Sequence, residues 1–138
     1  MFPRKSSMNK IREFFTSRAH SFGHAFRGWW YVIRTQRNAW IHAVITMLVI
    51  LVALWLHLSL RDWAMLFLTI ATVWTAEFIN TALEAVVDLA SPHQHPLAKV
   101  GKDVGAAAVL LASLAAILVG LLIMGPPLWV KIRTLLVK

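Results

Sequence analysis

The chain has 138 residues, of which 59% are hydrophobic, and its mean hydropathy is +0.66. It is too apolar for an ordinary soluble domain of this length, so we expect an integral membrane protein. The net charge of +8 would suit nucleic acid, but the distribution of the basic residues along the chain does not, and no nucleic-acid partner is expected. The absence of cysteine excludes disulfides, thiolate metal sites and thiol redox chemistry.

The N-terminal quarter of the chain is basic and aromatic. Residues 1–10 are polar, and we expect them to be disordered. Over residues 11–37, apolar side chains return to one helical face while basic ones lie opposite. This pattern predicts an amphipathic helix on the membrane surface rather than a helix packed on a soluble core. The apolar face consists of Phe14, Phe15, Phe22, Ala25, Phe26, Trp29 and Ile33.

Three transmembrane helices are predicted at residues 39–60, 62–90 and 97–123. The third contains 20 uncharged residues, Val104 to Ile123, which match a hydrocarbon core of about 30 Å. The second is apolar only from Trp63 to Ala76, which is about 21 Å of helix, so it can cross only by continuing toward Ala90. A tight turn is expected at Ser59 to Asp62. The helix-breaking residues Gly125, Pro126 and Pro127 are expected to end the third helix, leaving residues 128–138 as a basic tail.

The basic residues predict how the chain crosses the plasma membrane. Eight of the 14 Lys and Arg residues precede the first predicted span. The positive-inside rule then places the N-terminus and the second loop in the cytoplasm and the C-terminus outside. The predicted fold is therefore a single all-α, multi-pass membrane domain.

A polar stripe interrupts the second predicted span. At about 100° per residue, its members Glu77, Asn80, Thr81, Glu84 and Asp88 share one helical face. A charged residue near the bilayer centre costs about 2.5–3.5 kcal/mol, so such a stripe must face protein, water or a cation. Because three spans do not easily enclose it, we expect the acids to face an adjacent protomer in a homo-oligomer.

The stripe and the start of the next helix together have groups that are sufficient in kind for phosphoryl transfer to a lipid hydroxyl. Glu77 is the deepest acid, and a carboxylate removed from water binds protons more tightly, as suits a general base. Acids nearer water can hold Mg²⁺, and Lys102 at the start of the next helix can attract phosphate. Three alternatives stay open: ion pairs of Glu84 or Asp88 with Lys99 or Lys102, a proton or cation pathway, and a non-catalytic scaffold.

The segment AEFINTALEAVVDLASPHQHPLAKVGKDVGAAAVLLA resembles the signature of the prokaryotic diacylglycerol kinase family, which includes undecaprenol kinases. The similar pattern is ExxNxxxExxxD, followed 14 residues after Asp88 by Lys102 and Asp103. The resemblance covers about residues 21–120. It implies a homotrimer with active sites between protomers, ATP as phosphoryl donor, Mg²⁺ as cofactor and a lipid alcohol as acceptor.

The resemblance also assigns roles to individual residues. It implies that Glu77 is the catalytic base and that Glu84 is a metal ligand. It implies that the nucleotide contacts are Asn80, His95, Lys102 and Asp103. Asp88 is expected to be structural.

Residue 36 bears on activity, and two short segments bear on the choice of acceptor. The family usually has Glu where this chain has Gln36, so the resemblance implies a second metal ligand there that lacks a charge. Weaker Mg²⁺ binding is expected, and a catalytically weak family member is an alternative. The segments SFGHAFRG and TQRNAWIH resemble the undecaprenol kinases more than the diacylglycerol kinases, so undecaprenol is the favoured acceptor.

Overall fold

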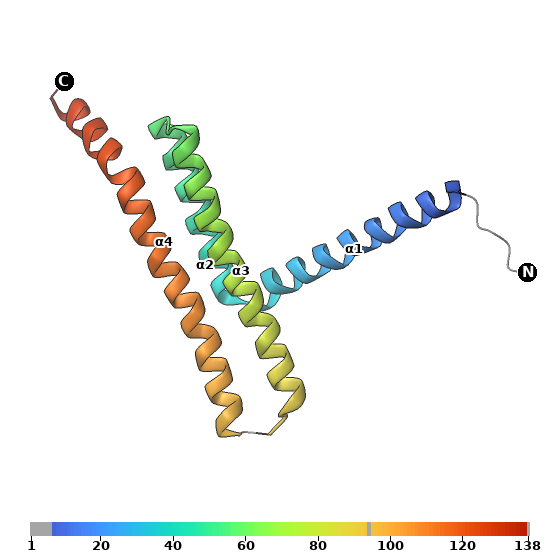
Figure 1. Cartoon of the computed structure of the whole chain (residues 1–138). Helices are drawn as coiled ribbons and strands as arrows, with labels where there is room; N and C mark the ends of the chain where they lie inside the picture. The colour runs from blue at the N-terminus through green and yellow to red at the C-terminus, as the bar shows by residue number, and fades with distance from the viewer. Residues whose placement is uncertain (1–6, 94, 138) are drawn as a thin grey trace, which may run out of the picture. The chain divides into compact units, whose positions relative to one another are not determined.

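The computed structural model describes residues 7–93 and 95–137. Within these residues the chain forms four helices, which are α1 (Ser7–Thr35), α2 (Arg37–Leu56), α3 (Leu60–Ala90) and α4 (Pro96–Leu136) (Figure 1). The chain divides into two compact units, Met1–Thr35 and Gln36–Lys138. The predicted all-helical fold is confirmed. So is the prediction of three helices that are long and apolar enough to cross a membrane, namely α2, α3 and α4.

Helix α1 begins inside the segment predicted to be disordered. Residues 1–6 of that segment lie outside the described residues, but the helix starts at Ser7 and ends at Thr35, two residues before the predicted end. The aromatic residues Phe22 and Phe26 are about two-thirds exposed. The guanidinium of Arg34 lies 4.7 Å from the Trp30 ring centroid, a cation–π contact. That α1 lies on a membrane surface stays a prediction.

Helix α2 is shifted toward the N-terminus from its predicted bounds of 39–60. It starts at Arg37, because Gln36 has an extended backbone with φ −101° and ψ 116°. It ends at Leu56, because His57 adopts a left-handed conformation with φ 56°. In this conformation the His57 and Leu58 N–H groups donate to the last free carbonyls of the helix. The break at Gln36 matters for the site described below.

The predicted turn at Ser59 to Asp62 is wrong, because Leu60 to Asp62 already form the first turn of α3. A capping box starts the helix: Ser59 Oγ accepts from the Asp62 N–H, and the Asp62 carboxylate accepts from the Ser59 N–H. Helix α3 has 31 residues and is about 46 Å long. It is therefore long enough to pass beyond a hydrocarbon core of about 30 Å.

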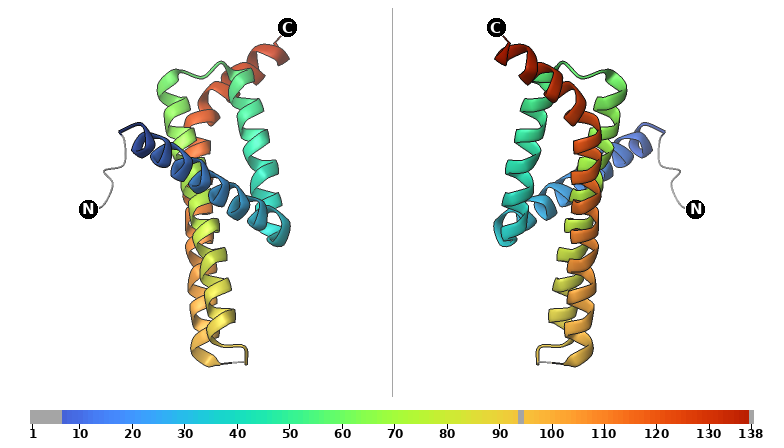
Figure 2. Two further views of the ribbon diagram at one scale, coloured as in Figure 1. Left: turned by 90° about the vertical axis from the view of Figure 1, so that its right-hand side faces the viewer. Right: turned by 90° about the vertical axis from the view of Figure 1, so that its left-hand side faces the viewer.

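The predicted end of the third span at Gly125, Pro126 and Pro127 is also wrong. Helix α4 continues through both prolines to Leu136, so residues 128–136 are its last turns rather than a separate tail. Proline inside a helix removes a hydrogen bond and bends the axis, and Figure 2 shows α4 curving toward its C-terminal end. The bent segment contacts α2 through Lys131. Its Nζ donates to the Trp55 carbonyl at 2.5 Å and lies 4.7 Å from the centroid of the Trp55 ring.

Helices α3 and α4 run antiparallel and pack side by side, and α2 contacts both (Figure 2). The small buried core between them includes Ala39, Ala53, Leu66, Val73 and Val109. Most large apolar side chains of these helices are exposed instead, as is typical of helices that face lipid. Because so few side chains are buried, the buried polar residues are conspicuous.

Candidate active site

The polar stripe on α3 passes from buried to exposed along the helix. Glu77 is 1% exposed, Asn80 and Thr81 are also buried, and the side chain of Asp88 is 65% exposed. Glu84 lies between these extremes. Our expectation that the acids need an adjacent protomer to cover them is wrong for Glu77, because this chain alone buries it. Helix α2 approaches α3 closely enough to cover the Glu77 carboxylate within one chain.

The partner of Glu77 is His42 of α2. The distance between His42 Nε2 and Glu77 Oε2 is 3.7 Å, and the His42 side chain is 13% exposed. Sequence reasoning missed this contact. The available signal was that His42 and His57 are the two titratable residues in an otherwise uncharged span.

A second cluster joins Gln36, Asn80 and Glu84. The Gln36 amide donates to Glu84 Oε2 at 3.2 Å, and the Asn80 amide donates to Glu84 Oε1 at 3.0 Å. Gln36 can reach α3 because it stands at the break before α2 and makes no side-chain bond to its own helix. The structure therefore brings together three of the predicted site residues within one chain.

This cluster is compatible with a Mg²⁺ site. Asn80 Oδ1 is buried, has no hydrogen-bond partner among the described residues and lies on the side of the amide that faces Gly105 of α4. In the described part of the chain, no three His, Cys, Asp or Glu side chains converge on a point. Mg²⁺ commonly uses one or two carboxylates and completes its shell with water and phosphate, so the Glu84 carboxylate fits in kind, with two amide side chains beside it that would have to turn their oxygens toward the cation to add ligands.

Gly105 of α4 lets the neighbouring helix approach Asn80. A Cβ atom built on Gly105 would collide with Asn80 Oδ1 and press on Leu83. Only glycine permits this approach without displacing the amide. Helix α4 thus closes one side of the cluster, and its small residue has a specific steric role.

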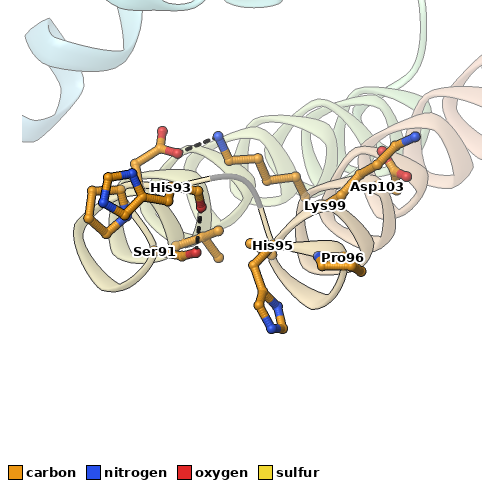
Figure 3. Close-up of a pocket in the computed structure, with 11 residues that line it drawn as sticks. Ser91, His93, His95, Pro96, Lys99 and Asp103 are labelled. Carbon is orange, nitrogen blue, oxygen red and sulfur yellow. Dashed lines mark hydrogen bonds and ion pairs between the residues drawn. The ribbon is translucent and has the colours of Figure 1, made fainter.

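The remaining predicted site residues line an open groove of about 720 Å³ at the α3–α4 connection. They are His95, Lys102 and Asp103, and Asp88, which was expected to be structural, lines the same groove. Figure 3 shows Lys99 and Asp103 on the first turns of α4, with the His95 ring directed away from them. His95 Nδ1 accepts from the Leu97 N–H at 3.2 Å, so His95 caps α4. Pro96 is the first helical residue, close to the predicted start at residue 97.

Lys102 is paired with Asp88, with 2.5 Å between Nζ and Oδ1. This ion pair is one of the structural alternatives that the sequence left open. Both side chains are partly exposed, so the pair contributes at most about 1 kcal/mol and can open for a ligand. The groove contains two cationic side chains, Lys99 and Lys102, and two carboxylates, Asp88 and Asp103.

The site residues thus form two groups. Glu77 and the Gln36–Asn80–Glu84 cluster lie on the inner side of α3, and the groove lies at its C-terminal end. A buried carboxylate on a membrane-spanning helix, with a groove of charged side chains at the end of the same helix, is the arrangement expected of an integral membrane enzyme that acts at a membrane surface.

Comparison with known proteins identifies the class. A model of the family "Prokaryotic diacylglycerol kinase" matches residues 23–124. The chain is 39% identical over 124 residues to undecaprenol kinase of Bacillus subtilis (strain 168), which covers 90% of this chain and 98% of that protein. It is 47% identical over 109 residues to a diacylglycerol kinase of Synechocystis, covering 78% of this chain and 62% of that protein. It is 34% identical over 89 residues to diacylglycerol kinase of Escherichia coli (strain K12), covering 59% and 73% respectively.

The chain therefore belongs to the prokaryotic diacylglycerol kinase family. This confirms the predicted family and the prediction of an ATP-dependent lipid kinase.

Proposed function

We propose that this protein transfers the γ-phosphate of ATP to the hydroxyl of a lipid alcohol, with undecaprenol favoured over diacylglycerol. The observation that carries the proposal is the buried Glu77 carboxylate on a membrane-spanning helix, whose Oε2 has no hydrogen-bond partner among the described residues. A buried carboxylate oxygen without a hydrogen-bond partner is destabilising and calls for an explanation. Abstraction of a proton from the hydroxyl of a membrane lipid is one such explanation. Family membership favours this chemistry over a proton or cation pathway.

The proposed reaction balances with Glu77 as the base. The acceptor O–H bond breaks and its proton passes to the Glu77 carboxylate, while the acceptor oxygen forms a bond to the γ-phosphorus. The bond between the γ-phosphorus and the β–γ bridging oxygen breaks, and ADP leaves. The proton is later released from Glu77 to water. The protein contributes mainly position and charge neutralisation, as in other phosphoryl transfers.

Glu84 is the proposed metal ligand, with the Gln36 and Asn80 side chains beside it. When bound, Mg²⁺ would neutralise charge on the phosphates. The two amides now orient the Glu84 oxygens through N–H donors, at 3.2 Å and 3.0 Å. The neutral Gln36 lowers the charge available to a cation, which leaves a catalytically weak member of the family as the alternative.

The groove at the α3–α4 connection is the proposed nucleotide site. Lys102 would exchange its contact with Asp88 for a phosphate oxygen, and the positive end of the α4 helix dipole favours the same anion. His95 and Asp103 line the groove and would contact the nucleoside part. Asp88 keeps the structural role expected of it and holds Lys102 before ATP arrives.

Oligomeric state and topology belong to the same proposal. We propose a homotrimer in the plasma membrane, with the N-terminus and the groove in the cytoplasm and the C-terminus outside. The exposed apolar surface of α2, α3 and α4 supports close contact with lipid or with further copies of the chain. The basic residues before α2 support a cytoplasmic N-terminus.

Undecaprenol is the favoured acceptor because this chain aligns with 98% of the length of the Bacillus subtilis relative named undecaprenol kinase. Diacylglycerol is the second candidate, because the Synechocystis relative named diacylglycerol kinase has the higher identity, 47%. Purified protein in mixed micelles with γ-labelled ATP distinguishes them when each lipid is supplied alone. We expect more label in undecaprenyl phosphate than in phosphatidic acid. Label in neither lipid contradicts the kinase proposal.

A further inference from the structure

His42 of α2 lies next to the Glu77 carboxylate of α3. Its Nε2 atom lies 3.7 Å from Glu77 Oε2, and both side chains are largely buried. Glu77 is the residue proposed above as base, so whatever fixes its carboxylate affects the reacting geometry. Glu84 lies two turns further along the same helix and is a second carboxylate close enough to act on Glu77.

The His42 ring is fixed by a tryptophan of α3. Trp74 stands one turn before Glu77, and its ring meets the His42 ring edge-on, with centroids 6.3 Å apart and planes at 64°. The Trp74 Nε1–H donates to Thr46 Oγ1 at 3.2 Å, one turn beyond His42 on α2. Trp74 therefore fixes the relative register of α2 and α3 at the level of Glu77. This leaves the imidazole little freedom to turn away.

Neither atom of the His42–Glu77 contact has a hydrogen-bond partner among the described residues. A buried polar atom left unpaired costs about 1–3 kcal/mol, so two atoms held face to face are an expensive arrangement. A shift of less than 1 Å would bring the two atoms from 3.7 Å to hydrogen-bond distance. The arrangement is thus close to a hydrogen bond across the two helices.

We infer that His42 is a positioning residue for Glu77. Its Nε2–H donates to Glu77 Oε2 during turnover and directs Oε1 toward the acceptor hydroxyl. The inference rests on the proposed function, in which Glu77 takes the acceptor proton, and adds a residue from α2 that the sequence pattern on α3 does not contain. His42 itself neither receives the acceptor proton nor touches ATP.

Two substitutions at position 42 test the donor directly. His42→Gln places an amide N–H near the position of Nε2, whereas His42→Asn places it near Nδ1, too short to reach Glu77. We expect His42→Asn to lower kcat by about 10- to 100-fold, the effect of a small misplacement of a reacting group, with the KM for ATP unchanged within about twofold. His42→Gln should recover most of kcat. His57→Asn, a histidine change at the other end of α2, is the matched control.

A double substitution shows whether His42 acts through Glu77. We expect the Glu77→Gln variant to retain slow transfer, and in this background His42→Asn should lower the residual rate by less than about twofold. Multiplicative losses, or equal kcat values for the Gln and Asn variants, would overturn the inference. Thermal unfolding of each variant identifies any loss of kcat that comes from misfolding. Because Gln and Asn have similar polarity, the difference in kcat between these two variants is informative even if both are less stable than the unchanged protein. If the unchanged protein labels no lipid, the proposed function fails and this inference fails with it; if it labels lipid, these results decide the inference alone.

Discussion

Gln36 donates a hydrogen bond to Glu84 across the gap between α2 and α3, with 3.2 Å between Nε2 and Oε2. The contact links a helix break to the acidic stripe, because Gln36 is free to reach Glu84 only where α2 has not yet begun. It also shows how a neutral residue is accommodated beside the carboxylate. The amide stabilises the Glu84 anion without a metal, and a second carboxylate in its place could not do so.

Gln36→Glu should therefore make the site more dependent on Mg²⁺. Two adjacent carboxylates repel each other without a cation, and together they bind one more strongly. We expect the apparent Mg²⁺ affinity to tighten by about tenfold, which is ~1.4 kcal/mol. Thermal unfolding with and without Mg²⁺ should show a larger metal-dependent rise in Tm for the variant than for the unchanged protein. Equal metal dependence of both proteins would place residue 36 outside the metal site.

Gly105→Ala should disturb the Asn80–Glu84 pair. Its new Cβ would collide with Asn80 Oδ1, and forcing an extra methyl group into a packed contact typically costs about 1–3 kcal/mol. We expect lower thermal stability and a lower kcat. Gly120→Ala is the matched control, because its Cβ would make ordinary contact with Met124 at 3.6 Å. Equal behaviour of the two variants would contradict a special role for Gly105.

Two variants, Lys102→Met and Asp88→Asn, should distinguish the proposed contact of Lys102 with ATP from the structural role of Asp88. Removing Lys102 takes a cation from the proposed phosphate site, so the KM for ATP should rise by about tenfold or more. Removing the Asp88 charge breaks a partly exposed pair and should change stability by at most about 1 kcal/mol. Steady-state kinetics over a range of ATP concentrations measures both effects. If Asp88→Asn raises the KM for ATP as much as Lys102→Met does, Asp88 has more than the structural role given to it here.

Lys131→Met should lower the stability of the packing between α2 and the C-terminal end of α4, which is far from the candidate active site. The change removes the hydrogen bond to the Trp55 carbonyl and the contact with its ring, which together are worth about 1–2 kcal/mol. We expect a lower Tm with kcat and KM unchanged. Arg133→Met, which removes an exposed basic residue from the same turn, should leave Tm nearly unchanged. A loss of activity in Lys131→Met without a loss of stability would contradict this assignment.

The helices and the polar stripe could be predicted from the sequence because each depends on local pattern. Hydrophobic length marked α2, α3 and α4, and the spacing from Glu77 to Asp88 placed the acids on one face. The ends of the helices were less predictable. Proline usually ends a helix, yet α4 continues through Pro126 and Pro127. The contact of Lys131 with α2 stabilises the turns that follow the two prolines.

The contacts between helices could not be predicted in this way. The positions of His42 and Gln36 opposite Glu77 and Glu84 depend on the register of α2 against α3, which Trp74 and Thr46 help to fix. No spacing within one helix contains this information. Nor did the sequence show that α2 buries Glu77, since burial depends on how closely two helices approach.

Glu77→Gln tests the central claim most directly, because it keeps the shape of the side chain and removes its basicity. The measurement is the rate of label transfer from γ-labelled ATP to undecaprenol in mixed micelles, together with the KM for ATP. General bases typically contribute 10²–10⁴-fold, so we predict a fall in kcat of at least about 100-fold with the KM for ATP little changed. A folded Glu77→Gln variant that transfers phosphate at near the normal rate would contradict the assignment of Glu77 as the base.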